Sequence, residues 1–277
     1  ETSFLSFDVD EFTVGRSDGV NGNAAQMVAW CWNAGGSTVP NSDGSIVSQV
    51  RANPATGFSV VTGSQSADNT VSTFGHGLGA EPKIIFLKRT HGIEDWYVYH
   101  KELGSTSRVQ LNSNAAETAG TSVWNSTTPT SSVFTIRGFN AGDFVAYCWS
   151  EVPGVSSFGS YSGNGGSNPI TTGFKPGYVL IKRTDSPENW LIVDSKSGTD
   201  RLLFANTTDQ QATTTFLEFT SDGFRLNTGG GGSNQAGGTY IYAAFADPNP
   251  PAPDTVLDTP MKDYAVIKSD GALNLSS

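Results

Sequence analysis

Few residues in this chain have the types and spacing that chemistry requires. Gly15-Arg16-Ser17-Asp18-Gly19 has the GxSxG spelling of a hydrolase nucleophile elbow, in which a strand-to-helix turn lifts the serine hydroxyl. Here the motif is expected in a hairpin between two strands. The later segments that match it, 140–143 and 229–238, contain no such pattern. We therefore interpret the motif as a turn.

A second glycine-rich segment, Gly75-His76-Gly77-Leu78-Gly79, resembles a dinucleotide loop but precedes an expected strand. Pyrophosphate binding instead requires a helix N-terminus. The histidines His76, His91 and His100 do not have the spacing of a zinc site, and no DxDxDG calcium loop is present. The sequence therefore predicts no metal and no cofactor.

Acidic residues offer only weak candidates for glycoside hydrolysis, which needs two carboxyl groups roughly 5 to 10 Å apart in a cleft. Glu94-Asp95, Glu151 and Glu218 qualify by residue type alone, and Asp95 is replaced by Asn189 in a second copy of its segment. No cleft follows from their positions in the sequence. We predict that the protein is not an enzyme.

Two basic triplets, Lys88-Arg89-Thr90 and Lys182-Arg183-Thr184, end expected buried strands, and each precedes a tryptophan by the same interval. Packing of the aliphatic stems over that ring is favoured over a basic ligand site. The two cysteines, Cys31 and Cys148, lie at equivalent positions of two copies of one strand. Equivalent residues of separate modules rarely meet, so we interpret both as small buried apolar residues rather than as a disulfide or reactive thiols.

The elements that would position these residues are repeated along the chain. Residues 28–32 read VAWCW, residues 145–149 read VAYCW, and residues 241–245 read IYAAF as a divergent copy. Residues 82–96 also align without a gap on residues 176–190, and residues 2–14 on residues 214–226. Such internal similarity indicates an array of one module.

Short apolar runs that alternate with Gly, Ser, Asn and Pro turns predict strands almost everywhere and no helix longer than a turn or two. We expect an all-β protein made of tandem antiparallel β-sandwich modules that resemble a jelly roll and are joined by short linkers. The predicted divisions are 1–34 as the end of an upstream module, 35–55 as a connector, 56–152 and 153–248 as complete sandwiches, 249–260 as a proline-rich linker, and 261–277 as the start of a further domain.

Charge and hydropathy restrict the partners. The chain has 16 Lys and Arg against 26 Asp and Glu, a formal net charge of −10. A negative surface repels phosphate backbones, so we expect no nucleic-acid partner. No apolar stretch is long enough to cross a membrane as a helix, and no signal peptide is seen at the start.

Several runs resemble repeats of tail-fibre and other virion structural proteins of marine phages, cyanophages included. These runs are Gly57-Phe58-Ser59-Val60-Val61, His76 to Gly79 with Pro82 to Lys88, and Phe7 to Gly15 leading to the strand at 28–32. The resemblance covers nearly all of residues 1–250. In that family a proline-rich joint and an Asp-Thr-Pro segment often lead into a SPRY-like or lectin-like sandwich, and residues 258–277 resemble such a start.

The resemblance implies a homotrimeric fibre or appendage subunit of the virion that contacts other virion proteins and carries or supports a surface for host polysaccharide. It supplies no catalytic residues. The candidate glycan-binding residues are aromatic residues that we expect to be exposed, because they lack a packing partner in the copied unit: Trp124 in an insertion of the first module and Tyr161 in a loop rich in Ser and Gly. Sandwich core or a subunit contact is the alternative for each. A secreted bacterial adhesin, a carbohydrate-binding module or a polysaccharide depolymerase remain alternative functions.

Overall fold

The computed structural model describes residues 3–7, 11–23, 26–65, 67–138 and 141–247, and the backbone of residues 264–268. The predicted linker at 249–260, and all of the predicted further domain except 264–268, lie outside these residues. The chain divides into two compact units, which are described separately: residues 1–32 with 259–277, and residues 33–258.

The smaller unit is built from strands β1 (Phe4–Phe7), β2 (Phe12–Val14), β3 (Val28–Trp32) and β23 (Tyr264–Lys268), with a single helical turn, α1 (Asp18–Asn21). Strands β1 and β2 pair as an antiparallel hairpin. Strand β23 pairs antiparallel with β3. The strand predicted to begin a further domain therefore pairs with the strand that closes residues 1–34.

The GxSxG motif directly follows β2, and its last two residues, Asp18 and Gly19, belong to α1, so the prediction of a hairpin between two strands is wrong. A helical turn forms because the amides of Val20 and Asn21 both donate to the carbonyl of Ser17. Ser17 has φ −69° and ψ 127°, an ordinary extended conformation, whereas a nucleophile elbow is strained. The unit's residues 1–32 and 259–277 also contain no histidine to act as a base.

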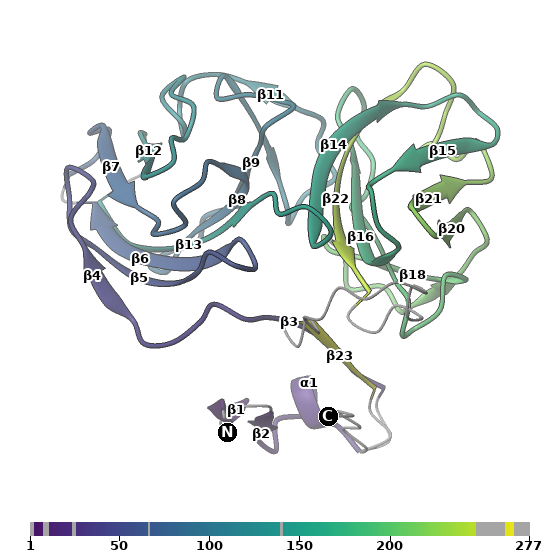
Figure 1. The fold of residues 1–277 in the computed structure, drawn as a ribbon, viewed down its shortest axis with the longest axis horizontal. Helices are drawn as coiled ribbons and strands as arrows, with labels where there is room; N and C mark the ends of the chain where they lie inside the picture. Colours follow the sequence, from purple (N-terminus) through teal and green to yellow (C-terminus); the bar gives the residue numbers. More distant parts are fainter. Residues whose placement is uncertain are drawn as a thin grey trace. The chain divides into compact units, whose positions relative to one another are not determined.

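The larger unit begins with a sandwich whose main sheet has eight strands in the order β11-β10-β9-β8-β13-β6-β5-β4, covered by the pair β12-β7 (Figure 1). Residues 35–55, predicted as a connector, instead form two strands of this sheet, and β5 pairs with β6 over five residue pairs. The ten strands are β4 (Val39–Asn41), β5 (Ser48–Asn53), β6 (Phe58–Gln65), β7 (Ser72–Gly75), β8 (Pro82–Arg89), β9 (Trp96–His100), β10 (Ser107–Gln110), β11 (Thr118–Ala119), β12 (Val133–Ile136) and β13 (Gly142–Ser150).

A second sandwich follows at once, because β13 ends at Ser150 and β14 starts at Ser156. Its main sheet has the order β14-β22-β16-β17-β18-β19, and its smaller sheet the order β15-β21-β20. The all-β antiparallel sandwich prediction is confirmed. The nine strands are β14 (Ser156–Ser162), β15 (Asn168–Thr171), β16 (Pro176–Arg183), β17 (Leu191–Asp194), β18 (Arg201–Phe204), β19 (Ala212–Thr213), β20 (Leu217–Thr220), β21 (Gly223–Leu226) and β22 (Thr239–Ala246).

The two sandwiches share several hydrogen bonds at matching positions. The amide of Trp96 donates to Asn112 Oδ1 at 2.9 Å, and the amide of Trp190 donates to Asn206 Oδ1 at 2.8 Å. Likewise Thr90 N–H donates to Asp143 O at 2.9 Å, as its copy does to Thr239 O at the same distance. A turn that recurs with its side-chain hydrogen bonds supports the interpretation of residues 56–247 as two copies of one module.

Each sandwich has its own apolar core, set by the alternation of side chains along the strands. In β13, Phe144, Ala146 and Cys148 point into the first core, and in β22, Tyr240, Tyr242 and Ala244 point into the second. The register places Cys148 opposite Ile85 and Ala244 opposite Val179 at matching positions. Cys148 is fully buried and unpaired by disulfide, as a small apolar residue would be.

The opposite faces of the main sheets are also largely buried, because the sandwiches pack on each other. Trp149 on the outer side of β13 lies 6.2 Å, ring to ring, from Phe245 on the outer side of β22. His100 Nε2 lies 3.1 Å from the carbonyl oxygen of Tyr242. The expectation of separate sandwiches on short linkers therefore does not hold for this pair. Other outer-face residues that are at most 6% exposed are Ile84, Val98, Tyr178, Leu180 and Ile192.

Candidate functional site

The seam between the two sandwiches is held by backbone groups of residues 110–117 from the first and of residues 184–190 from the second. Glu117 N–H donates to Thr184 O at 2.8 Å, and Glu188 N–H donates to Asn114 O at 2.9 Å. The indole N–H of Trp190 donates to Gln110 O at 2.8 Å. Residues 110–117 of the first sandwich are thus hydrogen-bonded to the loop between β16 and β17 of the second.

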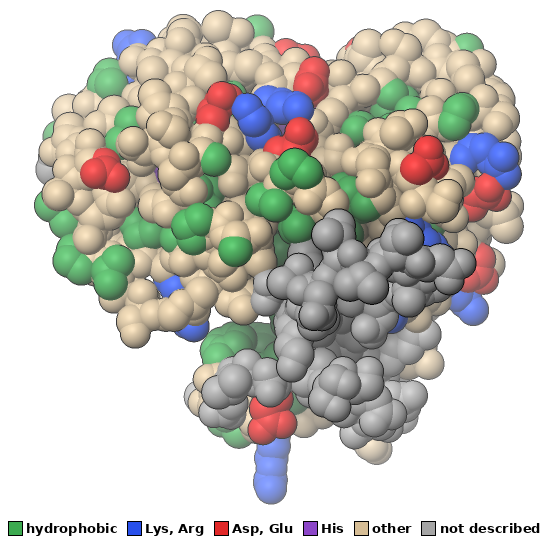
Figure 2. All heavy atoms as spheres, viewed as in Figure 1, with side chains coloured by type: hydrophobic (Ala, Val, Ile, Leu, Met, Phe, Trp, Pro, Cys, Tyr) green, Lys and Arg blue, Asp and Glu red, His purple; other side chains and the backbone are tan. Residues whose placement is uncertain are grey.

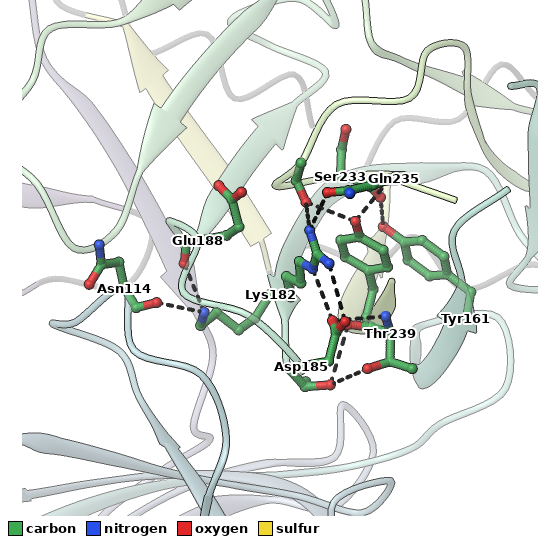
Figure 3. Close-up of polar contacts among 12 residues, drawn as sticks. Asn114, Tyr161, Lys182, Asp185, Glu188, Ser233, Gln235 and Thr239 are labelled. Atoms are coloured by element: carbon green, nitrogen blue, oxygen red, sulfur yellow. Dashed lines mark hydrogen bonds and ion pairs between the residues drawn. The ribbon is translucent and has the colours of Figure 1, made fainter. Parts of the chain in front are cut away.

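Lys182 is the central side chain of this seam. Its side chain is fully buried, and Nζ donates to Glu188 O at 2.8 Å and to Asn114 O at 3.1 Å (Figure 3). Burial lowers the pKa of this ammonium to about 8, and the nearby charge of Glu188 acts in the opposite direction. The lysine therefore remains mostly protonated at neutral pH, and the two carbonyl oxygens compensate part of its desolvation.

Arg183 and Asp185 form a second polar group beside Lys182. Arg183 Nε and Nη2 donate to the two carboxylate oxygens of Asp185 at 2.9 and 3.2 Å, and Nη1 donates to Gln235 Oε1 at 2.6 Å. The guanidinium also lies 5.9 Å from the ring centroid of Tyr240. Its hydrogen bonds hold the pKa of the Asp185 carboxyl far below its usual range. This bidentate pair fixes the loop that follows β16.

A cleft of about 540 Å³ opens where the sandwiches meet. Its lining is rich in hydroxyl groups, with two carboxylates and few apolar side chains. Ser160 Oγ donates to Glu102 Oε2 at 3.3 Å across it. Hydroxyl, carboxylate and aromatic groups are the partners that a hydroxyl-rich ligand needs. The lining residues are Glu102, Leu103, Glu117, Ser160, Tyr161, Ser162, Thr184, Thr239, Tyr240 and Ile241.

Tyr161, predicted as an exposed glycan-binding ring, does line this cleft but is only 9% exposed. Its ring stacks on Tyr240 with centroids 4.9 Å apart and planes 8° apart. Its hydroxyl donates to Ser233 O at 2.5 Å (Figure 3). The prediction of an exposed stacking surface is wrong here, because that ring belongs to the second core.

Trp124 is 2% exposed and lies in the core of the first sandwich, so the prediction of an exposed ring is wrong for it too. The residue before it, Val123, accepts a hydrogen bond at its carbonyl oxygen from the amide of Arg137. At the matching position of the second sandwich, Phe216 O accepts from the amide of Asn227, and both distances are 2.7 Å. Trp124 therefore takes the place of the core residue Leu217. Trp124 thus has a core counterpart in the second sandwich and does not belong to an insertion, and its large ring stays inside because burying it is strongly favourable.

The other acidic residues considered from the sequence, and the two buried histidines, each have their own partner. Glu94 pairs with Arg89, Glu151 with Lys101, and Glu218 with Arg225. Nε2 of the buried His76 ring lies 3.1 Å from Thr130 O, whereas Nε2 of His100 lies 3.1 Å from Tyr242 O, so the two rings have different partners. No group of three or more His, Cys, Asp or Glu side chains that could hold a metal occurs in the part of the chain that the structure describes.

Sequence reasoning missed the seam residues as a site, although their signal was present. The Lys-Arg-Thr triplet followed by tryptophan was interpreted as packing of the stems on the ring. The lysine instead donates to the carbonyl of the glutamate in the same hairpin, in both copies. Hydrogen bonds to backbone atoms of another segment leave no pattern in that segment's sequence, so the acceptor residues 110–117 could not be found.

A smaller opening of about 370 Å³ enters the end of the second sandwich, between Leu191, Leu202, Phe204 and Phe216. At the matching positions of the first sandwich, Tyr97 and Arg108 stand in place of Leu191 and Leu202, and the guanidinium of Arg108 lies 5.6 Å from the ring of Tyr97. The opening is thus a feature of the second copy.

Fold and site together define an all-β repeat protein whose two described sandwiches form one body around a polar seam. The chain belongs to the family described as Domain of unknown function (DUF7483), whose model matches residues 1–250. No curated protein and no solved structure matches the chain. Among the described residues, no helix is long and apolar enough to cross a membrane.

Proposed function

We propose that this chain is a structural subunit of a phage tail fibre or appendage that supports recognition of polysaccharide on the host surface. The observation that carries the proposal is the locked pair of repeats. Two copies of one module share a buried seam with five hydrogen bonds to backbone carbonyls, four between residues 110–117 and 182–190 and one from His100 to Tyr242. These bonds make a stiff body without a flexible linker. Such a body suits spanning distance and bearing load.

The seam cleft is the surface that we assign to glycan. It presents the carboxylates of Glu102 and Glu117 with the hydroxyls of Ser160, Ser162 and Thr239. Sugar hydroxyls both donate to carboxylates and accept from hydroxyls, so this lining suits a neutral or basic saccharide. Figure 2 shows that uncharged side chains and backbone dominate the visible surface of the molecule. Threefold assembly would multiply weak contacts into avidity.

Two experiments test the proposal. Immuno-electron microscopy of virions with antibody against this chain should label fibres or appendages. Label on no part of any virion, with the protein instead anchored on bacterial cells, would favour a secreted adhesin and overturn the proposal. Shortening of capsular polysaccharide on incubation with the protein would favour a depolymerase.

Binding is tested with a glycan array and the variant Glu117→Gln. The hydrogen bond of Glu117 to the second sandwich uses its backbone amide, so the variant keeps the seam while it removes a carboxylate from the cleft. We expect binding to fall about tenfold, the effect of one charged hydrogen bond. Glu218→Gln is the matched control, because Glu218 pairs with Arg225 on the smaller sheet. If both variants bind glycan equally well, the cleft is not the glycan-binding surface.

A further inference from the structure

The first sandwich carries a copy of the surface that locks the second sandwich in place. We call Lys182, Thr184, Glu188 and Trp190 the second docking surface, and Lys88, Thr90, Glu94 and Trp96 the first docking surface. Residue types are identical at all four positions. The internal hydrogen bond from lysine Nζ to the glutamate carbonyl is also the same, 2.6 Å in the first copy and 2.8 Å in the second.

The two docking surfaces differ in what covers them. Residues 110–117 cover the second, where Lys182, Thr184 and Trp190 are at most 6% exposed. In the first, Lys88 and Trp96 are only partly buried and Thr90 is exposed. Where Lys182 Nζ donates to two carbonyl oxygens, Lys88 Nζ donates to one within the described residues. The first surface therefore retains the donor that captures an extended segment.

Packing between the sandwiches leaves the first docking surface accessible. Strands β8 and β9 pair Ile84 with His100 at one end and Lys88 with Trp96 at the other. His100, at the former end, makes the contact to Tyr242. Trp96, at the latter end, stacks on Tyr147 of its own sandwich, with centroids 6.2 Å apart. The surface and the existing seam thus use opposite ends of the same strands.

The chain also contains a second copy of the segment that covers such a surface. Residues 204–211 align with residues 110–117 without a gap, because Arg201 pairs with Thr213 as Ser107 pairs with Ala119. Residues 208–211 are exposed. Since the captured groups of residues 110–117 are backbone carbonyls and an amide, a different sequence can replace them. Asp209 takes the position of Ala115, beside the carbonyl that would accept from Lys88, so the charges are complementary.

We infer that the first docking surface binds residues 204–211 of a second copy of this chain. In that contact Lys88 donates to Thr208 O, the indole of Trp96 to Phe204 O, and the amide of Gln211 to Thr90 O. The contact joins different surfaces of the two copies, so it is head to tail and extends into an open array and not a closed dimer. The inference does not depend on glycan binding.

The test uses the full chain. Isotopically labelled and unlabelled chains are mixed and treated with a zero-length carbodiimide, which joins amines to neighbouring carboxylates, and cross-linked peptides are identified by mass spectrometry. We expect Lys88 linked to Asp209 with one label from each parent chain. Sedimentation velocity should show the average mass rising with concentration. A chain that stays monomeric, or Lys88–Asp209 links only between peptides of the same label, would overturn the inference.

Matched variants separate the contact from the fold. Gln211→Pro removes the donating amide and Gln211→Ala keeps it, so only the proline should weaken self-association, by about tenfold for one hydrogen bond. Lys88→Met should weaken it similarly, whereas Lys83→Met, at the other end of β8 in an ion pair with Glu81, should not. Thermal unfolding of each variant checks its folding. Equal association by Gln211→Pro and Gln211→Ala in folded protein would also refute the contact.

Discussion

Protonation of His100 should weaken the seam in mild acid. The ring is 1% exposed, Nε2 donates to Tyr242 O at 3.1 Å, and Nδ1 lies 3.2 Å from the amide nitrogen of Glu102. Both contacts are satisfied by the neutral ring with its proton on Nε2. A second proton on Nδ1 would face the N–H of Glu102. Burial, with a smaller effect of Lys101, lowers the pKa of His100 from 6.5 to about 4.

The sign and size follow from this shift. Between pH 6.5 and 4 the unfolded chain binds a proton at His100 that the folded chain does not, so the free energy of unfolding falls as the pH falls. A shift from 6.5 to about 4 corresponds to about 3 to 4 kcal/mol at about 1.4 kcal/mol per pH unit. This contribution is present at pH 7, is mostly lost by pH 4, and is fully lost below pH 4.

Urea unfolding followed by tryptophan fluorescence at a series of pH values measures the loss. We expect His100→Gln to remove most of this pH dependence, because an amide can still donate to Tyr242 O but does not titrate. His76, whose pKa burial also lowers, contributes to both curves, so the difference isolates His100. His91→Gln, at an exposed position, serves as control. If wild type and His100→Gln lose equal stability between pH 7 and 4, the reasoning is wrong.

Three further predictions concern stability and reactivity. Trp124→Ala should lower the free energy of unfolding by about 3–5 kcal/mol, measured in urea, while glycan binding by the folded variant is unchanged; a loss near zero would contradict core placement. Lys182→Met removes the lysine hydrogen bonds to Glu188 O and Asn114 O, of which Asn114 O keeps the amide of Glu188 as a donor. This variant should cost about 1–3 kcal/mol and Lys88→Met clearly less; the reverse order would count against the seam. The Cys148 thiol, fully buried with a raised pKa, should react with a thiol reagent only after unfolding, whereas prompt reaction of both cysteines in native protein would show that its burial is wrong.

Local patterns determined much of the architecture. Alternating apolar residues, Gly-rich turns and the repeated VAYCW-type strand were sufficient to predict an all-β antiparallel sandwich and its copying, because strand periodicity and turn chemistry act over a few residues. Burial of Cys148 followed from its place in that strand. The connector at 35–55 was missed since its strands β4 and β5 are short and polar, and their pairing with β6 is a contact between segments.

The tertiary structure alone decided which side chains are buried and how the two sandwiches contact each other. Trp124 and Tyr161 could be exposed or buried by sequence, and packing against Tyr99 and Tyr240 settled both. Lys88 and Lys182 follow the same local pattern, yet Lys182 is buried because residues 110–117 of the other sandwich cover it. Its partners there are backbone atoms, which every residue type supplies. A sequence therefore encodes the donor of such a contact but leaves its acceptor unmarked until the chain is folded.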